Sequence, residues 1–204
     1  MSKPKPANPA LAISEADLAS ALALIGTEVD DQPLRSSALA RIMRETFHGS
    51  DAGGAWDWRM AYDMMQAAAI QVLLRGAGAT ADIANAKLLA SRLLTETRRS
   101  EQQIRLQQFS TPLPFAALAL RAAAVRKGET VLEPSAGTGA LAAFAARAGA
   151  TLVLNEIDPF RQRLLRAVFG GEVTGHDGEH IDDLLQSPVL PDVVVMNPPF
   201  ASSV

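Results

Sequence analysis

The tetrapeptide at residues 197–200 has the residue types of a site that holds a planar amine. Pro198 and Pro199 fix the backbone and leave carbonyl oxygens without a neighbouring amide that competes for them. The side-chain oxygen of Asn197 and the carbonyl of Pro198 can then accept both hydrogens of an –NH2 group. This arrangement turns the nitrogen lone pair towards an electrophilic methyl group. Phe200 offers a flat face on which a flipped-out base can stack.

A glycine-rich loop lies upstream, where residues 133–139 read Glu-Pro-Ser-Ala-Gly-Thr-Gly between a strand pattern and a helix pattern. Gly137 and Gly139 permit positive φ angles and let a ligand approach the bare backbone. The free amides at the start of the following helix favour a carboxylate or a phosphate. Glycine also simply ends many strands, so the loop alone indicates no more than a nucleotide-like ligand.

An acidic residue follows the next strand pattern, about 20 residues beyond the glycine loop. A carboxylate at that place can accept hydrogen bonds from both hydroxyls of a ribose. Two candidates stand there, Glu156 and Asp158. Asp158 precedes a helix that opens with proline and is expected to cap it. We therefore assign the ribose to Glu156.

The turn at residues 175–180 contains a further acid and two histidines. In a parallel sheet the strand ends line one crevice, so Asp177 is placed to meet an adenine amino group. His176 and His180 have the spacing of a metal-ligand pair, but no third ligand stands at suitable spacing. We expect no metal site and interpret both histidines as solvated loop residues.

The elements that must position these residues change character along the chain. The first part has helical periodicity without a strand signal; the second alternates strands and helices, which is typical of a parallel, doubly wound sheet. The predicted fold is α/β, with a flexible leader at 1–13, a helical region at 14–108 and a sheet domain at 109–204. Predicted helices cover 14–25, 34–48, 58–74, 82–108, 114–125, 140–148 and 159–169; predicted strands cover 130–133, 151–155, 172–174 and 193–196.

Composition and charge limit the cellular compartment and the partners that we expect for this chain. The chain has no cysteine, which excludes disulfides and thiolate metal sites. No apolar run approaches the roughly 20 residues that span a bilayer, so we expect a cytoplasmic protein. Residues 1–127 hold 15 Lys/Arg against 12 Asp/Glu, whereas residues 128–204 hold 4 against 10. A polyanion is therefore expected against the first part, or against something outside this chain.

Taken together and in this order, the segments resemble the gamma-type adenine-N6 DNA methyltransferases, which use S-adenosyl-L-methionine. The resemblance spans about residues 109–200. Its motifs are specific jointly and not singly. They are Phe109-x-Thr111-Pro112, Glu133-Pro134-x-Ala136-Gly137-x-Gly139, Glu156-x-Asp158-Pro159, Asp177 and Asn197-Pro198-Pro199-Phe200.

The resemblance implies a role for each matched residue. Phe109, Thr111 and Pro112 would close over the methionine end of the cofactor, beside the glycine loop. Glu156 would hold the ribose and Asp177 the cofactor adenine. The loop at 197–200 would hold the target adenine of DNA.

The same family has seven strands in the order 3-2-1-4-5-7-6, whereas this chain stops four residues after Phe200. We expect strands 1–4 only, completed by a longer chain or a second one, and little activity from the 204 residues alone. A looser resemblance of the whole arrangement points to large bacterial, phage and plasmid proteins in which a methylase precedes a strawberry-notch-like helicase region. Residues 193–196 are apolar throughout, which predicts a strand covered on both faces.

Three alternatives remain open. The tetrapeptide at 197–200 also fits methyltransferases that act on RNA or on a protein glutamine. A second alternative is a non-catalytic interaction module in which the helical region is the working part. A nucleotide-dependent dehydrogenase would explain the glycine loop but not Asn197 and Phe200.

Overall fold

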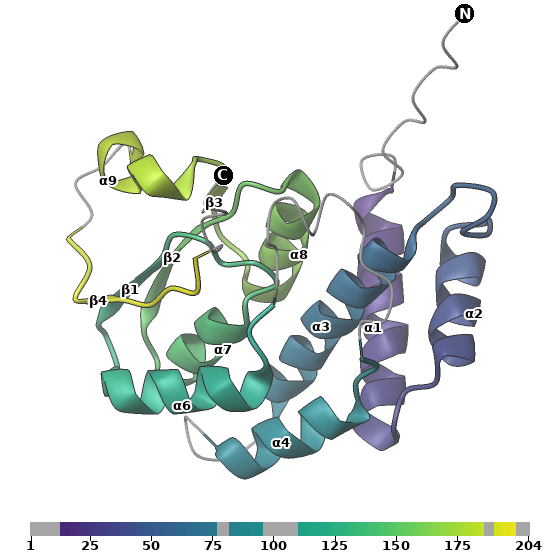
Figure 1. Ribbon diagram of the computed structural model, residues 1–204, viewed down its shortest axis with the longest axis horizontal. Coiled ribbons are helices and arrows are strands. Elements are labelled where there is room, and N and C mark those ends of the chain that lie inside the picture. Colours follow the sequence, from purple (N-terminus) through teal and green to yellow (C-terminus); the bar gives the residue numbers. More distant parts are fainter. Residues whose placement is uncertain (1–12, 77–81, 96–109, 186–189, 199–204) are drawn as a thin grey trace, which may run out of the picture.

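The computed structural model describes residues 13–76, 82–95, 110–185 and 190–198 (Figure 1). The predicted leader, apart from Ile13, lies outside the described residues. So do three predicted site residues, Phe109, Pro199 and Phe200.

Helices make up the first part of the described chain, as predicted. They are α1 (Glu15–Asp31), α2 (Ser36–Thr46), α3 (Trp58–Arg75) and α4 (Ile83–Arg92). Short polar side chains begin three of them because their oxygens accept first-turn amide hydrogens. Ser14 accepts from Asp17, Asp57 from Met60, and Asp82 from the two amides at 84 and 85.

Helix α1 ends six residues later than predicted, at Asp31 instead of Ile25. Gly26 lies inside the helix instead of ending it, because α1 crosses closely over α3 at this residue: a Cβ there would lie 3.2 Å from the Arg75 guanidinium and 3.6 Å from Val72. The extra turn also buries Val29 completely. Tertiary packing therefore outweighs the low helix propensity of glycine.

Helix α4 is shorter than predicted, and the expected helix at 82–108 is wrong for residues 93–95. Leu93 has extended backbone angles, φ −84° and ψ 150°. The chain leaves the helix here and Leu93 and Leu94 pack against the core, where the Leu94 amide lies 3.3 Å from the sulfur of Met65. The rest of the predicted helix, residues 96–108, lies outside the described residues.

The second part of the chain is α/β with a parallel four-stranded sheet, which confirms the predicted fold class at that level. The strand order is β3-β2-β1-β4, and each pairing is parallel. The strands are β1 (Thr130–Glu133), β2 (Thr151–Asn155), β3 (Val173–Thr174) and β4 (Val193–Val194); the helices are α6 (Leu113–Ala123), α7 (Ala140–Arg147), α8 (Pro159–Phe169), the 3₁₀ turn η2 (Gly178–His180) and α9 (Ile181–Leu184).

Strand β4 lies at the edge of the described sheet, and the prediction that both its faces are covered is wrong for the described residues. Val195 is buried and its amide donates to Leu132 across 3.0 Å. Val194 and Met196 are 46% and 55% exposed. One face of the strand therefore packs on the core and the other meets solvent.

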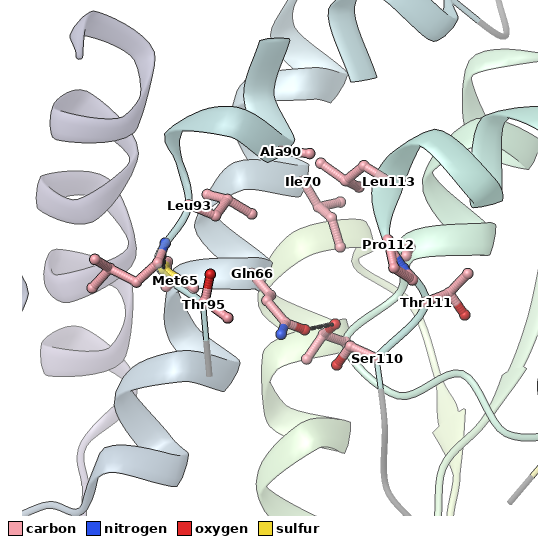
Figure 2. A pocket seen from close by; sticks show the side chains of 13 residues that line it. Met65, Gln66, Ile70, Ala90, Leu93, Thr95, Ser110, Thr111, Pro112 and Leu113 are labelled. Carbon is pink, nitrogen blue, oxygen red and sulfur yellow. Dashed lines mark hydrogen bonds between the residues drawn. The ribbon is translucent and has the colours of Figure 1, made fainter. Parts of the chain in front are cut away.

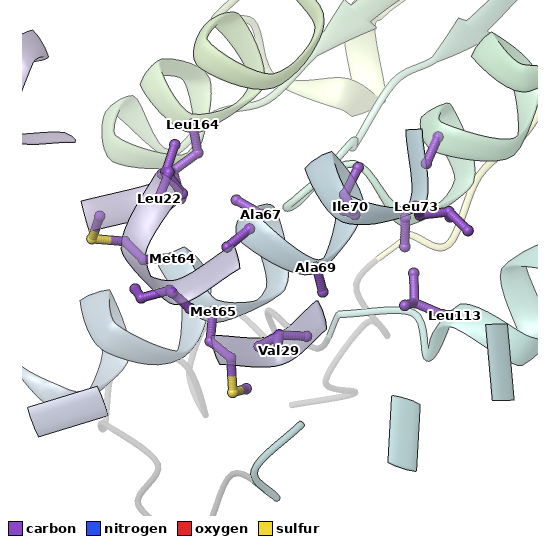
Figure 3. Packing of buried hydrophobic residues seen from close by; sticks show 14 of the residues in the cluster. Leu22, Val29, Met64, Met65, Ala67, Ala69, Ile70, Leu73, Leu113 and Leu164 are labelled. Atoms are coloured by element: carbon purple, nitrogen blue, oxygen red, sulfur yellow. The ribbon is translucent and has the colours of Figure 1, made fainter. Parts of the chain in front are cut away.

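The molecule is layered, with α7 and α8 between the sheet and the helices of the first part (Figure 1). Helix α3 packs on α7 and α8 on one side and on α1 on the other. Figure 3 shows Leu22 of α1 and Met64 of α3 beside Leu164 of α8. A single cluster of buried residues thus contains side chains from both sides of the predicted domain boundary at residue 108. The division into two domains stays a prediction.

Within the described residues, no helix is both long and apolar enough to cross a membrane.

Candidate functional site

The carboxyl ends of the parallel strands meet at one edge of the sheet, and a predicted site residue follows each of them. The glycine loop begins at the end of β1, Glu156 follows β2, Asp177 follows β3 and Asn197 follows β4. Loops at this edge form the ligand crevice of open parallel sheets. The topology therefore brings together residues that lie up to 64 positions apart in the sequence.

The two glycines of the loop serve different purposes. Both have positive φ, 58° at Gly137 and 94° at Gly139. A Cβ at Gly139 would lie 2.5 Å from the ring of Phe169 in α8, so the packing of helices requires this glycine. A Cβ at Gly137 would meet nothing within 4 Å, so its backbone faces open space where a ligand can approach.

Glu156 ties the glycine loop to the start of α8. Its Oε2 accepts a hydrogen bond of 2.7 Å from the Gly137 amide, and its Oε1 accepts one of 2.8 Å from the Asp158 amide. The residue is only 5% exposed, and this burial raises the pKa of its carboxyl, although both amides act in the opposite direction. Each carboxylate oxygen can accept more than one hydrogen bond, so both remain able to accept from ligand hydroxyls.

Asn155 is a central residue of the site that the sequence interpretation missed. Its side-chain NH2 donates to the carbonyls of Pro134 and His176 across 2.8 and 2.9 Å. Its Oδ1 accepts from the His176 amide and from the Thr174 hydroxyl. The loops after β1 and β3 are therefore pinned to the end of β2. The signal was available: a polar amide ends an otherwise apolar strand.

Asp177 lies at the surface beside the glycine loop. Its side chain accepts from the Glu179 amide across 3.1 Å and so begins η2. A Cβ at Gly178 would lie 3.1 Å from the carbonyl of Pro134, which shows how closely this turn packs on the glycine loop. No cluster of three or more metal-ligating side chains is found among the described residues.

Glu133 holds a buried oxygen that no described residue satisfies. The residue is 2% exposed, and its Oε2 has no hydrogen-bond partner among the residues that the structure describes. Burial raises the pKa of its carboxyl well above the usual value, and the nearby charge of Glu156 acts in the same direction. A buried polar atom without a partner is costly, so its presence calls for an explanation such as a catalytic role or a bound water or ion.

The loop after β4 meets the segment that precedes α6. The Asn197 side-chain nitrogen donates to the Thr111 hydroxyl across 3.1 Å, which joins two predicted site segments 86 residues apart. Asn197, Pro198 and Pro112 are exposed, and Thr111 is partly buried. The Asn197 side chain therefore remains accessible to a ligand.

A cavity of about 370 Å³ lies between this segment, the glycine loop and the helical region (Figure 2). The wall of the cavity contains both hydroxyl-bearing and apolar side chains. Thr111 is one of the lining residues, and its hydroxyl also accepts the hydrogen bond from Asn197. The described lining consists of Met65, Gln66, Ile70, Ala90, Leu93, Leu94, Thr95, Ser110, Thr111, Pro112, Leu113, Thr138 and Ala140.

Asp158 caps α8, as the sequence predicted, by accepting from the amides of Phe160 and Arg161. It also forms an ion pair with Arg59 of α3. Burial is the largest influence on the Asp158 carboxyl and would raise its pKa, but the charge and hydrogen bond of Arg59 together with the amide and charge of Arg161 lower the pKa below its usual value.

The crevice thus offers a ligand a glycine backbone, three carboxyl groups and an exposed amide. No family model, curated protein or solved structure matches this chain.

Proposed function

We propose that this chain binds S-adenosyl-L-methionine in a Rossmann-like methyltransferase fold and serves methyl transfer to the exocyclic amine of adenine in DNA. One observation carries the proposal: the glycine loop, Glu156, Asp177 and Asn197 follow successive strands of one parallel sheet at the same edge. A nucleoside cofactor lies across such an edge. The amide after the last of these strands distinguishes an amine acceptor from other substrates.

The residues fit this cofactor in chemical terms. Gly137 offers a backbone that a ligand can reach without meeting a side chain. Glu156 offers two buried carboxylate oxygens, which suit the vicinal hydroxyls of a ribose. The unpartnered oxygen of Glu133 suits a donor such as an ammonium group.

In methyl transfer the main task of the protein is to position the target amine against the methyl group of the cofactor. The bound cofactor supplies a methyl group already activated on a sulfonium. The side-chain oxygen of Asn197 accepts a hydrogen bond from one N–H of the target amine, and the Pro198 carbonyl accepts one from the other N–H. The nitrogen lone pair then points towards the methyl group. The amine loses its proton after attack, so no strong general base is needed.

The acceptor is the part of the proposal with the most alternatives. RNA adenine or guanine and a protein glutamine also present a planar –NH2 group. The Thr111-Pro112 segment and the residue sequence of the glycine loop resemble those of adenine-N6 DNA methyltransferases and therefore favour adenine in DNA as the acceptor. DNA is expected to contact the first part of the chain or parts outside it, because residues 128–204 carry a net charge of −6. A helicase-like region or a second chain is the proposed source of those parts.

Transfer of a labelled methyl group tests the proposal. The chain is incubated with labelled S-adenosylmethionine and, separately, with duplex DNA, RNA and glutamine-containing peptides. Since we expect little activity from the 204 residues alone, we expect a small amount of label, in the N6 position of adenine in DNA, and none with Asn197→Ala. Label in peptide alone, or in RNA alone, would replace DNA as the acceptor. Cofactor binding without any transfer would favour the interaction-module alternative.

A further inference from the structure

One face of α3 presents a row of polar side chains to the proposed cofactor loops. Arg59, Asp63 and Gln66 are four and three positions apart, so they share one side of the helix. That side faces the starts of α7 and α8, the helices that follow the glycine loop and Glu156. Helix α3 belongs to the helical region, to which the sequence assigns no role.

At the glycine loop the contact is made by Gln66. Its Oε1 accepts a hydrogen bond of 2.9 Å from the hydroxyl of Thr138 (dashed in Figure 2). Thr138 is 2% exposed and lies between Gly137 and Gly139. Glycines on both sides leave the loop backbone with wide conformational freedom, and this hydrogen bond restricts it.

Residues 156–161 run from Glu156 into the first turn of α8 and are called the ribose turn below; here the contacts with α3 are ionic. Arg161 donates to Asp63 through Nη2 at 2.8 Å and through Nε at 3.2 Å, and the Asp63 and Arg161 side chains are 0% and 3% exposed. Arg59 pairs with Asp158, whose backbone amide in turn donates to Glu156. Helix α3 is thus connected to the carboxylate that we assign to the ribose.

We infer that α3 is a positioning element of the cofactor site, which it holds through Gln66 on the glycine loop and through Arg59 and Asp63 on the ribose turn. The inference rests on the proposed function. It gives the helical region a role: α3 fixes the distance between the glycine loop and Glu156. At that distance the Gly137 amide can donate its hydrogen bond to Glu156. The side chains of α3 act through the loops and do not themselves transfer a methyl group.

Titration of the full chain with S-adenosylmethionine tests the inference. Gln66→Ala removes the acceptor of the Thr138 hydroxyl and is expected to weaken binding by roughly fivefold, the effect of one neutral hydrogen bond. The matched control is Gln71→Ala on the same helix. The Gln71 side chain bonds the carbonyl of Ala167 near the end of α8, away from both loops, so this variant should bind as the wild type does.

A double-mutant cycle separates positioning from general stability. Thr138→Val should weaken binding as much as Gln66→Ala does, and the double variant should add little to either. Gln66→Glu keeps an accepting oxygen and should bind within about twofold of wild type. Thr138→Val removes the donor of the same hydrogen bond and serves as the test if Gln66→Ala does not fold. Urea midpoints of all variants are measured alongside, because a purely structural role changes these midpoints and leaves affinity alone.

The outcomes distinguish the inference from the proposed function. If the wild type binds and Gln66→Ala binds equally well, or loses no more affinity than Gln71→Ala, the inference is overturned and the proposed function stands. If the wild type does not bind S-adenosylmethionine, the proposed function is overturned and the inference falls with it.

Discussion

Replacing Asp63 by asparagine is expected to destabilise the protein by about 3–5 kcal/mol, because it leaves the buried guanidinium of Arg161 without its main counter-charge. The pair joins α3 to α8 and is removed from water, with the side chains 0% and 3% exposed. Three N–O contacts of 2.8, 3.2 and 3.2 Å disappear or weaken in the variant. Arg161 cannot escape by losing its proton, since its surroundings raise the pKa further above the usual value despite burial.

The assay is equilibrium unfolding in urea. With a slope of about 2 kcal/mol per molar urea, the expected loss lowers the midpoint by roughly 2 M. Replacing both partners by apolar residues, Asp63→Leu with Arg161→Met, should recover most of the stability, because it removes the buried charges together.

An exposed ion pair provides the control. Arg41 and Glu45 pair across 3.2 Å on α2 with side chains 48% and 59% exposed, so Glu45→Gln should cost less than about 1 kcal/mol. A loss below about 1 kcal/mol in Asp63→Asn would contradict this expectation, since it would mean that the pair is solvated and does not hold α3 to α8.

Further predictions concern the strand ends. Gly139→Ala should cost about 2 kcal/mol or more of unfolding free energy in urea, because of its positive φ and the clash with Phe169. Asn155→Ala should lower the urea midpoint and speed hydrogen exchange of the loops after β1 and β3, which it pins. The raised pKa of Glu133 favours the folded state below the usual carboxyl pKa of 4.5, and this contribution is lost as pH rises through the raised value. The wild-type urea midpoint, measured relative to that of Glu133→Gln, should therefore decrease as the pH is raised above 4.5.

Most elements of the sheet half could be predicted because their signals are local. The strands at 130–133 and 151–155 and the helix at 159–169 have the predicted bounds. Each is bounded by glycine, proline or a capping residue, and such residues act within a turn of the chain. Asp158 illustrates this, since it caps α8 as its place before proline indicates.

Errors arose where packing between distant segments decides the outcome. The ends of α1 and α4 depend on contacts with α3, at Gly26 in one case and at Leu94 in the other. The exposure of Val194 depends on what lies beside the strand. The sequence around each of these positions does not indicate which distant residues pack against it.

The candidate site divides in the same way. Residue types at strand ends pointed to Glu156 and Asn197. The bond between Asn197 and Thr111 and the contact of Gln66 with the glycine loop join segments 86 and 72 residues apart. The available signal for the second of these connections was Gln66 itself, a polar side chain between Met65 and Ala67 on α3.

Calorimetric titration of the wild type and of Glu156→Ala with S-adenosylmethionine shows whether the strand ends hold this cofactor. We expect saturable binding to the wild type at one site per chain. Glu156→Ala, folded by circular dichroism, should bind at least about tenfold more weakly, because two charge-assisted hydrogen bonds from the ribose are lost. Absence of binding to the wild type, or equal affinity of the two proteins, would contradict the proposed cofactor site.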